Sequence, residues 1–430
     1  MPMRPIPLTQ GGPFRPVLMT LLMFGSTHVW AQETASLAIN EPVSGTNALR
    51  NADASQLAQP SRPLEEAFNA AVRLRIEGAL EASSQEAERC YQLAASPDDL
   101  ASFGAACKEL AAGNAFIQGD HGRWAKSALD LQDRIRATYA ASAGGRVIVL
   151  ENFVGIDFQS IASAFDGPVQ AALPKKVVKV TRVGKDQAGF DLDKEPVLIE
   201  IEINGKRETA LVDTGSSISV INTQTASRMG LKTIADHYVP ISDPSRKDQV
   251  SSKLVKVDEL ALGEAKLNEV AFAVSTLPTI IGLDILQKLS PVLLSREDVT
   301  LFAKTRDCDS QSRYRSKWLG DFGLVSKLSI DGKERLVHID TGDDASIAAL
   351  KGSALTVSSP VESRSMAAVG GHHAMRFQKK SFQLHSGEVD GEVRPDLEDA
   401  FAYRIGSAIL KDRDLWIDAS HMRACLLEQE

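Results

Sequence analysis

The sequence predicts an α-helical N-terminal domain followed by a mainly β C-terminal region built from two related halves. Apolar residues recur at helical spacing between about 61 and 142, whereas β-branched runs and an internal repeat occupy the chain beyond about 143. The chain has 430 residues, which is enough for about three domains.

The composition is that of an ordinary globular protein. Hydrophobic residues make up 43% and charged residues 24%, which excludes collagen, coiled coil and wholesale disorder. Lys and Arg number 48 against 56 Asp and Glu, a formal charge of −8, so no global attraction to nucleic acid or anionic lipid is expected. Aromatic residues are only 6%, which argues against a base-stacking surface. No nucleic-acid partner is predicted.

Residues 1–31 have the pattern of a cleaved secretory signal peptide. A basic start precedes an apolar stretch over residues 16–24, and Val29-Trp30-Ala31 resembles a small-x-small cleavage site. An uncleaved N-terminal anchor is the alternative, but the stretch is shorter than the roughly 20 apolar residues that span a bilayer, and no later stretch reaches that length. We therefore expect an exported protein, periplasmic or secreted, with no stable membrane span.

Export also affects how the 4 cysteines are interpreted. An even number in an oxidising compartment allows two disulfides, with three pairings that sequence alone does not separate. We favour Cys90 with Cys107 and Cys308 with Cys425, because each pair then falls inside one predicted domain. Buried free thiols are the alternative.

Three segments are predicted before the β repeat begins. Residues 32–60 lack periodic apolar positions and suit a flexible leader, residues 61–142 form a helical domain, and residues 143–190 are a connecting segment with a few strands. Ser96 is placed to cap a helix that begins at Pro97. Apolar residues at four-residue spacing predict one helix face: Phe68, Val72, Ile76 and Leu80.

The end of the helical domain, residues 113–129, resembles one tetratricopeptide unit, in which small residues let two helices pack closely across a tight turn. A plain helical bundle is the alternative. The segment has no catalytic constellation, so any function beyond folding would be to present a groove to a protein partner.

The most informative feature is an internal repeat that carries two aspartates. Ile203-Asn204-Gly205-Lys206 precedes Asp213-Thr214-Gly215, and Ile330-Asp331-Gly332-Lys333 precedes Asp340-Thr341-Gly342 without a gap. Each copy predicts a strand, a tight turn and a second strand that ends in Asp-Thr-Gly. A single Asp-Thr-Gly often only closes a hairpin, but two matched copies indicate a shared function.

The repeat continues downstream of each aspartate. Ile281-Gly282 follows the first copy and Ile405-Gly406 the second, and each is followed by a short apolar strand, Val292-Leu293-Leu294 or Leu415-Trp416-Ile417.

Two aspartates suit hydrolysis of a peptide bond without a metal ion. One group must take a proton from water while another donates one to the substrate. Two adjacent carboxylates cannot both ionise, so they share one proton and titrate as a pair. The glycine after each threonine is expected to permit a tight turn, and each threonine hydroxyl to bond across to the other loop.

From about residue 195 to 430 the pattern resembles the retropepsin-like aspartic proteases of the pepsin superfamily. The resemblance implies two β-barrel lobes, residues 191–305 and 306–430, that form a pseudo-dimer on one chain. It implies an aspartic-type endopeptidase that acts on a peptide or protein and needs no cofactor. By position, Asp213 and Asp340 would be catalytic, and Ile281-Gly282 and Ile405-Gly406 would pack beneath the two loops. The residues that would support the dyad are Thr214, Gly215, Ser216, Thr341, Gly342 and Asp343.

The resemblance also implies a flap that closes over the substrate. Val369, Gly370 and Gly371 resemble a flap tip, where glycines allow the turn. The first copy has residues 242–253 in the corresponding place, without glycine. His372 and His373 follow, but adjacent residues of an extended hairpin point to opposite faces, so no metal site is predicted there.

The second copy departs from the family pattern at three positions. Asp343 and Asp344 replace the small residues Ser216 and Ser217 of the first copy, and Arg404 precedes Ile405-Gly406 where an apolar residue is expected. A third carboxylate beside the dyad would raise the apparent pKa of the pair, so Asp343 is predicted to influence the pH optimum. The alternative to an active enzyme is a catalytically silent adaptor that binds peptide in the β lobes and a partner through the helical domain.

Overall fold

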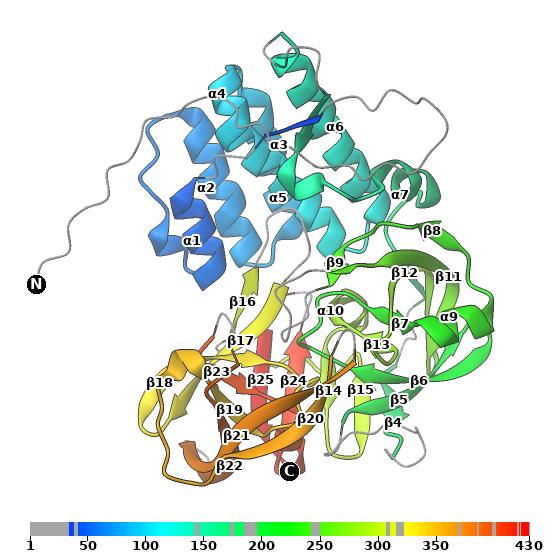
Figure 1. Cartoon of the computed structure of the whole chain (residues 1–430), viewed down its shortest axis with the longest axis vertical. Helices are drawn as coiled ribbons and strands as arrows, with labels where there is room; N and C mark the ends of the chain where they lie inside the picture. The colour runs from blue at the N-terminus through cyan, green and yellow to red at the C-terminus, as the bar shows by residue number, and fades with distance from the viewer. Residues whose placement is uncertain are drawn as a thin grey trace, which may run out of the picture.

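The structure, a computed structural model, describes residues 34–37, 42–141, 143, 147–172, 176–184, 196–241, 250–306, 310–314, 322–368, 371–384, 387–397, 401–418, 421 and 423–429. A helical region, residues 43–139, lies above two sheet-rich lobes that stand side by side (Figure 1). The predicted fold class is therefore confirmed: a helical N-terminal part precedes barrel-like sheets. Among the described residues, no helix is both long enough and apolar enough to cross a membrane.

The helical part is an array of helices packed mainly against their neighbours in sequence. Its helices are α1 (Val43–Asn51), α2 (Pro63–Ile76), α3 (Leu80–Leu93), α4 (Pro97–Asp99), α5 (Ala105–Ile117), α6 (His121–Tyr139) and α7 (Phe158–Ala164), with a π-helical turn at Leu100–Gly104 before α5. Ser96 caps α4 as predicted, because its side chain accepts a hydrogen bond from Asp99 N at 3.1 Å.

The predicted single face from Phe68 to Leu80 belongs to two helices. Phe68 and Val72 are fully buried on α2, but α2 ends at Ile76 and Leu80 begins α3. Gly78 lies between the two helices with φ of +81°. This left-handed conformation ends a helix, and glycine adopts it more readily than any other residue. Apolar spacing alone does not reveal this turn.

The predicted flexible leader contains ordered elements, so this prediction is corrected. β1 (Thr34–Leu37) pairs in parallel with β2 (Val147–Leu150), and α1 buries Ala48 and Leu49 against its neighbours. The sequence did not predict α1 because its buried face has only a few apolar side chains. These are too few to form a recognisable helical repeat of apolar residues.

One predicted disulfide, Cys90–Cys107, is present and joins α3 to α5. Cys425 is also disulfide-bonded, and its predicted partner, Cys308, lies outside the described residues.

Removing the Cys90–Cys107 disulfide is expected to destabilise the helical part. The two cysteines are 17 residues apart in the sequence. Closing a loop of that size lowers the conformational entropy of the unfolded chain, which raises the free energy of unfolding by about 3 kcal/mol. Urea unfolding of the double variant Cys90→Ala/Cys107→Ala, followed by circular dichroism, measures the loss. Under reducing conditions the wild type and the variant should unfold at closer urea concentrations, and equal midpoints without reductant would contradict the prediction.

The first lobe is a curved sheet with the strand order β3-β12-β7-β13-β6-β5-β11-β8, in which β11 and β12 also pair. Its strands and helices are β3 (Gln170–Ala172), β5 (Leu198–Ile203), β6 (Lys206–Val212), β7 (Val220–Asn222), α9 (Thr223–Met229), β8 (Thr233–Ala235), β9 (Pro240–Ile241), β10 (Val250–Ser251), β11 (Lys253–Leu262), β12 (Ala265–Ser275), β13 (Ile280–Ile281) and α10 (Leu283–Leu286).

The second lobe repeats this plan with the strand order β16-β17-β18-β23-β19-β22-β21-β20. Its strands are β16 (Ser310–Tyr314), β17 (Phe322–Ile330), β18 (Lys333–Ile339), β19 (Ile347–Leu350), β20 (Glu362–Ala368), β21 (Gly371–Leu384), β22 (Gly387–Arg394) and β23 (Tyr403–Ile405).

The predicted turns of the repeat are present in both lobes. β5 and β6 form a hairpin across Asn204 and Gly205, and β17 and β18 form one across Asp331 and Gly332. All four turn residues have positive φ, between 50° and 74°, as a two-residue turn between right-twisted strands requires.

A third sheet joins the two lobes, with the strand order β25-β24-β14-β15-β4. It contains β4 (Val178–Thr181), β14 (Val292–Leu294), β15 (Asp298–Leu301), β24 (Arg413–Asp418) and β25 (Arg423–Glu428). At its centre β14 pairs antiparallel with β24, so Leu293 lies opposite Trp416. The two apolar strands of the sequence repeat are thus each other's partners across the lobes.

The connecting segment supplies strands to the β region. β3 pairs with β12 at the edge of the first lobe, and β4 pairs with β15 in the shared sheet. The segment also contains α7, which the sequence did not predict.

The helical part and the first lobe are joined by buried side chains. Tyr238 of the first lobe contacts the His121 ring nitrogen Nδ1 through its hydroxyl, at 3.3 Å, and packs against Phe116 and Trp124. The Lys288 ammonium donates to the carbonyl oxygen of Gln118, at the end of α5. The helical part therefore shares a core with the first lobe.

Candidate active site

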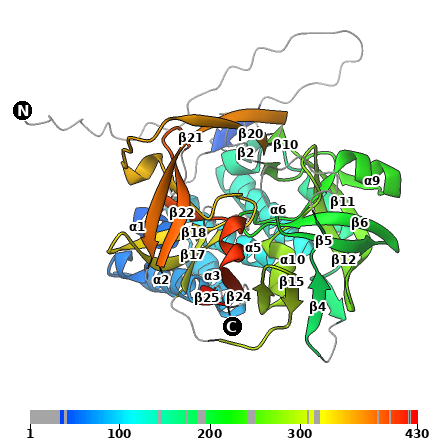
Figure 2. The same cartoon turned by 90° about the horizontal axis from the view of Figure 1, so that it is seen from below.

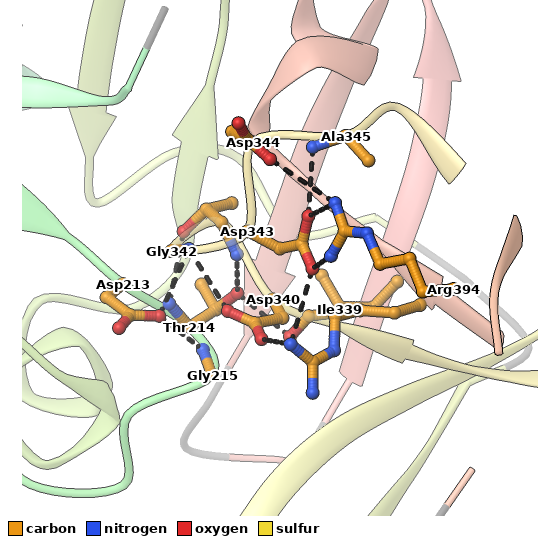
Figure 3. A network of polar contacts seen from close by, with 12 residues as sticks. Asp213, Thr214, Gly215, Ile339, Asp340, Gly342, Asp343, Asp344, Ala345 and Arg394 are labelled. Carbon is orange, nitrogen blue, oxygen red and sulfur yellow. Dashed lines mark hydrogen bonds and ion pairs between the residues drawn. The ribbon is translucent and has the colours of Figure 1, made fainter. Parts of the chain in front are cut away.

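The two Asp-Thr-Gly loops occupy matching places at the ends of β6 and β18. Asp213 N donates to Ile281 O at 3.0 Å, and Asp340 N donates to Ile405 O at 2.8 Å. Each aspartate is thus fixed by the strand that carries the Ile-Gly element. The loops meet between the lobes, so the two aspartates lie close together (Figure 3).

The glycine of each Ile-Gly element packs directly under a loop, as the resemblance implies. A Cβ atom on Gly282 would lie 2.6 Å from Ile218 O, and one on Gly406 would lie 2.4 Å from Asp343 O. Any larger residue would push the loop out of place.

The two threonines interlock across the lobes. Thr214 N donates to Thr341 Oγ1 at 3.1 Å, and Thr341 N donates to Thr214 Oγ1 at 3.0 Å. The hydroxyls donate in turn to backbone carbonyls of the opposite lobe, Thr214 to Ile339 O at 2.9 Å and Thr341 to Val212 O at 2.7 Å. This reciprocal set is fully buried and holds the loops in register, as the sequence predicted.

Gly215 and Gly342 are required by space rather than by backbone conformation. Each loop turns tightly as predicted, since Ser216 N donates to Asp213 O at 3.3 Å and Asp343 N donates to Asp340 O at 3.0 Å. Neither glycine has a positive φ, so the turn itself does not demand glycine. A Cβ on Gly215 would lie 2.2 Å from Asp340 Oδ1, and one on Gly342 would lie 2.5 Å from the Asp213 carboxyl. The absence of a side chain lets each loop approach the carboxyl group of the other.

The two carboxyl groups share a backbone donor. Gly342 N lies 3.1 Å from Asp213 Oδ1 and 3.1 Å from Asp340 Oδ1, and Gly215 N donates to Asp213 Oδ1 at 2.8 Å. Asp340 is buried, whereas Asp213 keeps a partly exposed face. Burial by the surrounding protein, together with the charge and hydrogen bond of Asp340, raises the pKa of Asp213 to about 8. The pair is therefore expected to hold one proton at neutral pH.

Ser216 and Asp343 occupy equivalent places but make different contacts. Ser216 bonds within its own loop, where its hydroxyl donates to Ile218 O at 2.7 Å. The Asp343 side chain instead turns toward Arg394, which binds both of its oxygens (Figure 3). A second arginine, Arg404, places its Nη1 3.3 Å from Asp343 Oδ2.

This arrangement corrects the predicted effect of Asp343 on the dyad. Burial alone would raise the pKa of Asp343, but the charges of Arg394 and Arg404 hold that pKa below its usual range. Its charge is therefore balanced locally, and Asp343 does not act as an uncompensated third carboxylate beside the dyad.

Sequence reasoning missed Arg394 and Arg364, and it noted Arg404 only as a departure from the family pattern. Arg394 also bonds Glu392, and Arg364 of β20 pairs with both Glu392 and Asp344. Two acids in place of small residues are a signal that cations lie nearby. The sequence does not say which arginines these are, because Arg394 is 51 residues from Asp343.

The predicted flap of the second lobe lies on the hairpin of β20 and β21. Gly371 begins β21 and pairs with Ala368, while Val369 and Gly370 lie outside the described residues. Figure 2 shows this hairpin as a long ribbon along one edge of the molecule. In the first lobe β9 and β10 form a short antiparallel pair, and residues 242–249 between them are not described.

Metal ions need groupings of several ligating side chains. Among the described residues, no three or more His, Cys, Asp or Glu side chains are grouped so that they could hold a metal ion.

Comparison with known proteins agrees with this geometry. The sequence model of the aspartyl protease family matches residues 199–296, which include Asp213. A search of curated proteins found no match to the chain.

Two solved structures are similar to parts of the chain. One is a retropepsin-like aspartic protease from Rickettsia conorii, with 14% identity and a TM-score of 0.22, covering 31% of this chain and 92% of that one. The other is the EIAV protease in complex with the inhibitor HBY-793, with 25% identity and a TM-score of 0.20, covering 23% of this chain and 92% of that one. The tetratricopeptide resemblance of the helical part stays a prediction. The predicted resemblance to the retropepsin-like aspartic proteases is confirmed, and the family match lies in the first lobe.

Proposed function

We propose that this chain is an exported aspartic endopeptidase that hydrolyses peptide bonds with water activated by Asp213 and Asp340. The observation that carries the proposal is the meeting of the two carboxyl groups at one donor, Gly342 N. Export rests on the signal-peptide pattern of residues 1–31.

The chemistry needs only the pair and a water molecule. One carboxylate takes a proton from water as the water oxygen attacks the peptide carbonyl carbon, and the protonated partner gives its proton to the carbonyl oxygen. When the tetrahedral intermediate breaks down, a proton passes to the leaving amine and the pair returns to its starting state. The raised pKa of Asp213, about 8, supports a protonated partner at neutral pH.

The substrate class is an extended peptide. A strand laid between the flap hairpin of β20 and β21 and the dyad could bond through its backbone, which is a common way for a sheet edge to recognise peptide.

A peptide library tests the proposal. Mature protein, residues 32–430, is incubated with the library from pH 3 to 8, with and without a statine-type inhibitor, and the products are read by mass spectrometry. The inhibitor hydroxyl mimics the tetrahedral intermediate, so cleavage that the inhibitor blocks is the expected result. No cleavage across the whole pH range would favour the alternative, an adaptor that binds peptide without cutting it.

A further inference from the structure

A single arginine contacts one member of the dyad and not the other. Arg404 lies on β23, and its Nη1 is 3.0 Å from Asp340 Oδ2. The equivalent position in the first lobe, immediately before Ile281-Gly282, is Ile280, a buried apolar residue. The two halves of the site are therefore alike in backbone but differ in charge.

Arg404 forms ion pairs with both Asp340 and Asp343. Arg394 contacts both carboxylate oxygens of Asp343, one of them at 2.9 Å, and both side chains are almost completely buried. Arg394 supplies two hydrogen bonds to Asp343, and Arg404 adds a third, longer one at 3.3 Å. Arg404 therefore faces both acids, and its Nη1 lies closer to Asp340 Oδ2, at 3.0 Å.

Other charged groups around Arg404 come from several elements. The Asp-Thr-Gly loops contribute Asp213, Asp340, Asp343 and Asp344, β22 contributes Glu392 and Arg394, β20 contributes Arg364, and His338 of β18 lies beside Arg404 in the strand register. Among the described residues of this network, and apart from the dyad, Arg364, Arg394 and Arg404 balance Asp343, Asp344 and Glu392. A single negative charge on the dyad is therefore the only net charge that these described acids and arginines add.

We propose that Arg404 is a positioning residue that places the negative charge of the dyad on Asp340 and leaves the shared proton on Asp213. This inference rests on the proposed function of the pair. A guanidinium only donates hydrogen bonds, so the Asp340 oxygen that it contacts acts as an acceptor. Asp213 is contacted by backbone N–H groups and by Asp340.

The assignment gives the two aspartates distinct roles. Asp340 takes the proton of the attacking water, and Asp213 gives its proton to the peptide carbonyl oxygen. After this step Asp340 is protonated and Asp213 carries the negative charge, so atoms and charge balance. Arg404 then favours return of the charge to Asp340 as the leaving amine receives a proton. The raised pKa of Asp213, about 8, is in agreement with this starting state.

The pH dependence of kcat/KM tests the role of Arg404. Arg404→Ile gives the second lobe the residue type found in the first, and Arg404→Gln removes the charge while keeping an amide donor. Loss of the cation is expected to move the acidic limb of the profile to higher pH by about one to three units. Arg404→Lys keeps the charge and should restore most of the wild-type limb. An unmoved limb in a folded neutral variant would overturn the proposal.

An exposed arginine provides the matched control. Arg207 is the second residue of β6, at the opposite end of the strand from Asp213, and pairs with Glu200 at 3.5 Å on the surface. Arg207→Gln should keep the wild-type pH profile. If it shifted the limb as much as Arg404→Gln, the effect would be one of net charge and the assignment to Arg404 would fail.

A second readout separates this inference from the proposed function. Protein labelled with ¹³C at the aspartate carboxyl groups is titrated by NMR, and the dyad signals are assigned with Asp213→Asn and Asp340→Asn. In the wild type the Asp213 signal should be that of a protonated carboxyl group at neutral pH, whereas in Arg404→Gln it should move toward that of a carboxylate, because the shared proton is no longer kept on Asp213. Identical Asp213 signals in the two proteins would refute the role of Arg404 even in an active enzyme. A wild type that cleaves nothing but shows the expected difference would refute the proteolytic function alone.

Discussion

Replacing Asp213 with Asn is expected to lower kcat/KM by about 10² to 10⁴-fold, which is the usual contribution of a general acid or base. An amide cannot give up a proton as the carboxyl group does, yet its shape is nearly the same. The Gly215 and Gly342 N–H groups can still bond to the amide oxygen, so the loops should keep their geometry. Asp340→Asn should be similarly inactive, because the pair works as a unit.

The same substitution changes how stability depends on pH. The folded-state pKa of Asp213 is about 8, above the ordinary value of 3.8, so the folded protein holds a proton that the unfolded chain has released. The stabilisation from that proton is present in full below about 3.8 and is lost as pH rises through about 8. The wild type should therefore lose thermal stability across this range, and Asp213→Asn should lack that part of the slope.

A surface aspartate serves as the control for both measurements. Asp258 is exposed on β11, so Asp258→Asn changes the formal charge equally without touching the site. It should retain activity and the wild-type stability profile. Cleavage by Asp213→Asn at the wild-type rate would refute the proposed mechanism.

Replacing Arg394 with Met is expected to destabilise the second lobe by about 3 kcal/mol at pH 7, since it removes one partner of a buried charge pair. Arg394 is 1% exposed and bonds both Asp343 and Glu392. Arg404 and Arg364 still contact these acids, which places the expected loss at the lower end of the range for a broken buried pair. Urea unfolding followed by tryptophan fluorescence gives the change.

Two further variants show whether burial causes this effect. Arg62 is an exposed arginine that also contacts two acids, Glu65 and Asp99, so Arg62→Met should have a far smaller effect. In the double variant Arg394→Met/Asp343→Asn one of the orphaned charges is also removed, and part of the stability should return. Equal losses for Arg394→Met and Arg62→Met would contradict a stabilising role of the buried network.

The Arg394 effect should also depend on pH in a defined direction. The folded-state pKa of Asp343 is held below 3.8, so its stabilisation is present above 3.8 and is lost as pH falls through the lower, folded-state value. The difference between the wild type and Arg394→Met should therefore shrink in strong acid.

Local patterns were enough to predict the framework of the β region. Asn204-Gly205 and Asp331-Gly332 predicted two hairpins because a two-residue turn with positive φ needs such residues. The repeat of Asp-Thr-Gly and Ile-Gly predicted two equivalent lobes with one aspartate each. It also anticipated the interlocked threonines, since a hydroxyl beside a buried loop must find a partner.

Other features depend on contacts between distant residues. Gly78 ends α2 inside an unbroken apolar period, and the few buried residues of α1 gave no periodic signal. The glycines after the threonines are needed because each faces the opposite carboxyl group, and that approach exists only once the lobes pair.

By itself, the sequence determined that the chain has two matched loops, each with an aspartate, on a repeated β framework behind a helical domain. Only the tertiary structure decided the electrostatics of those loops. Asp343 resembles a third acid in the sequence, but Arg394 and Arg404 come to it from 51 and 61 residues away. Charge interactions depend on distance and burial in space, and neither can be read from separation along the chain.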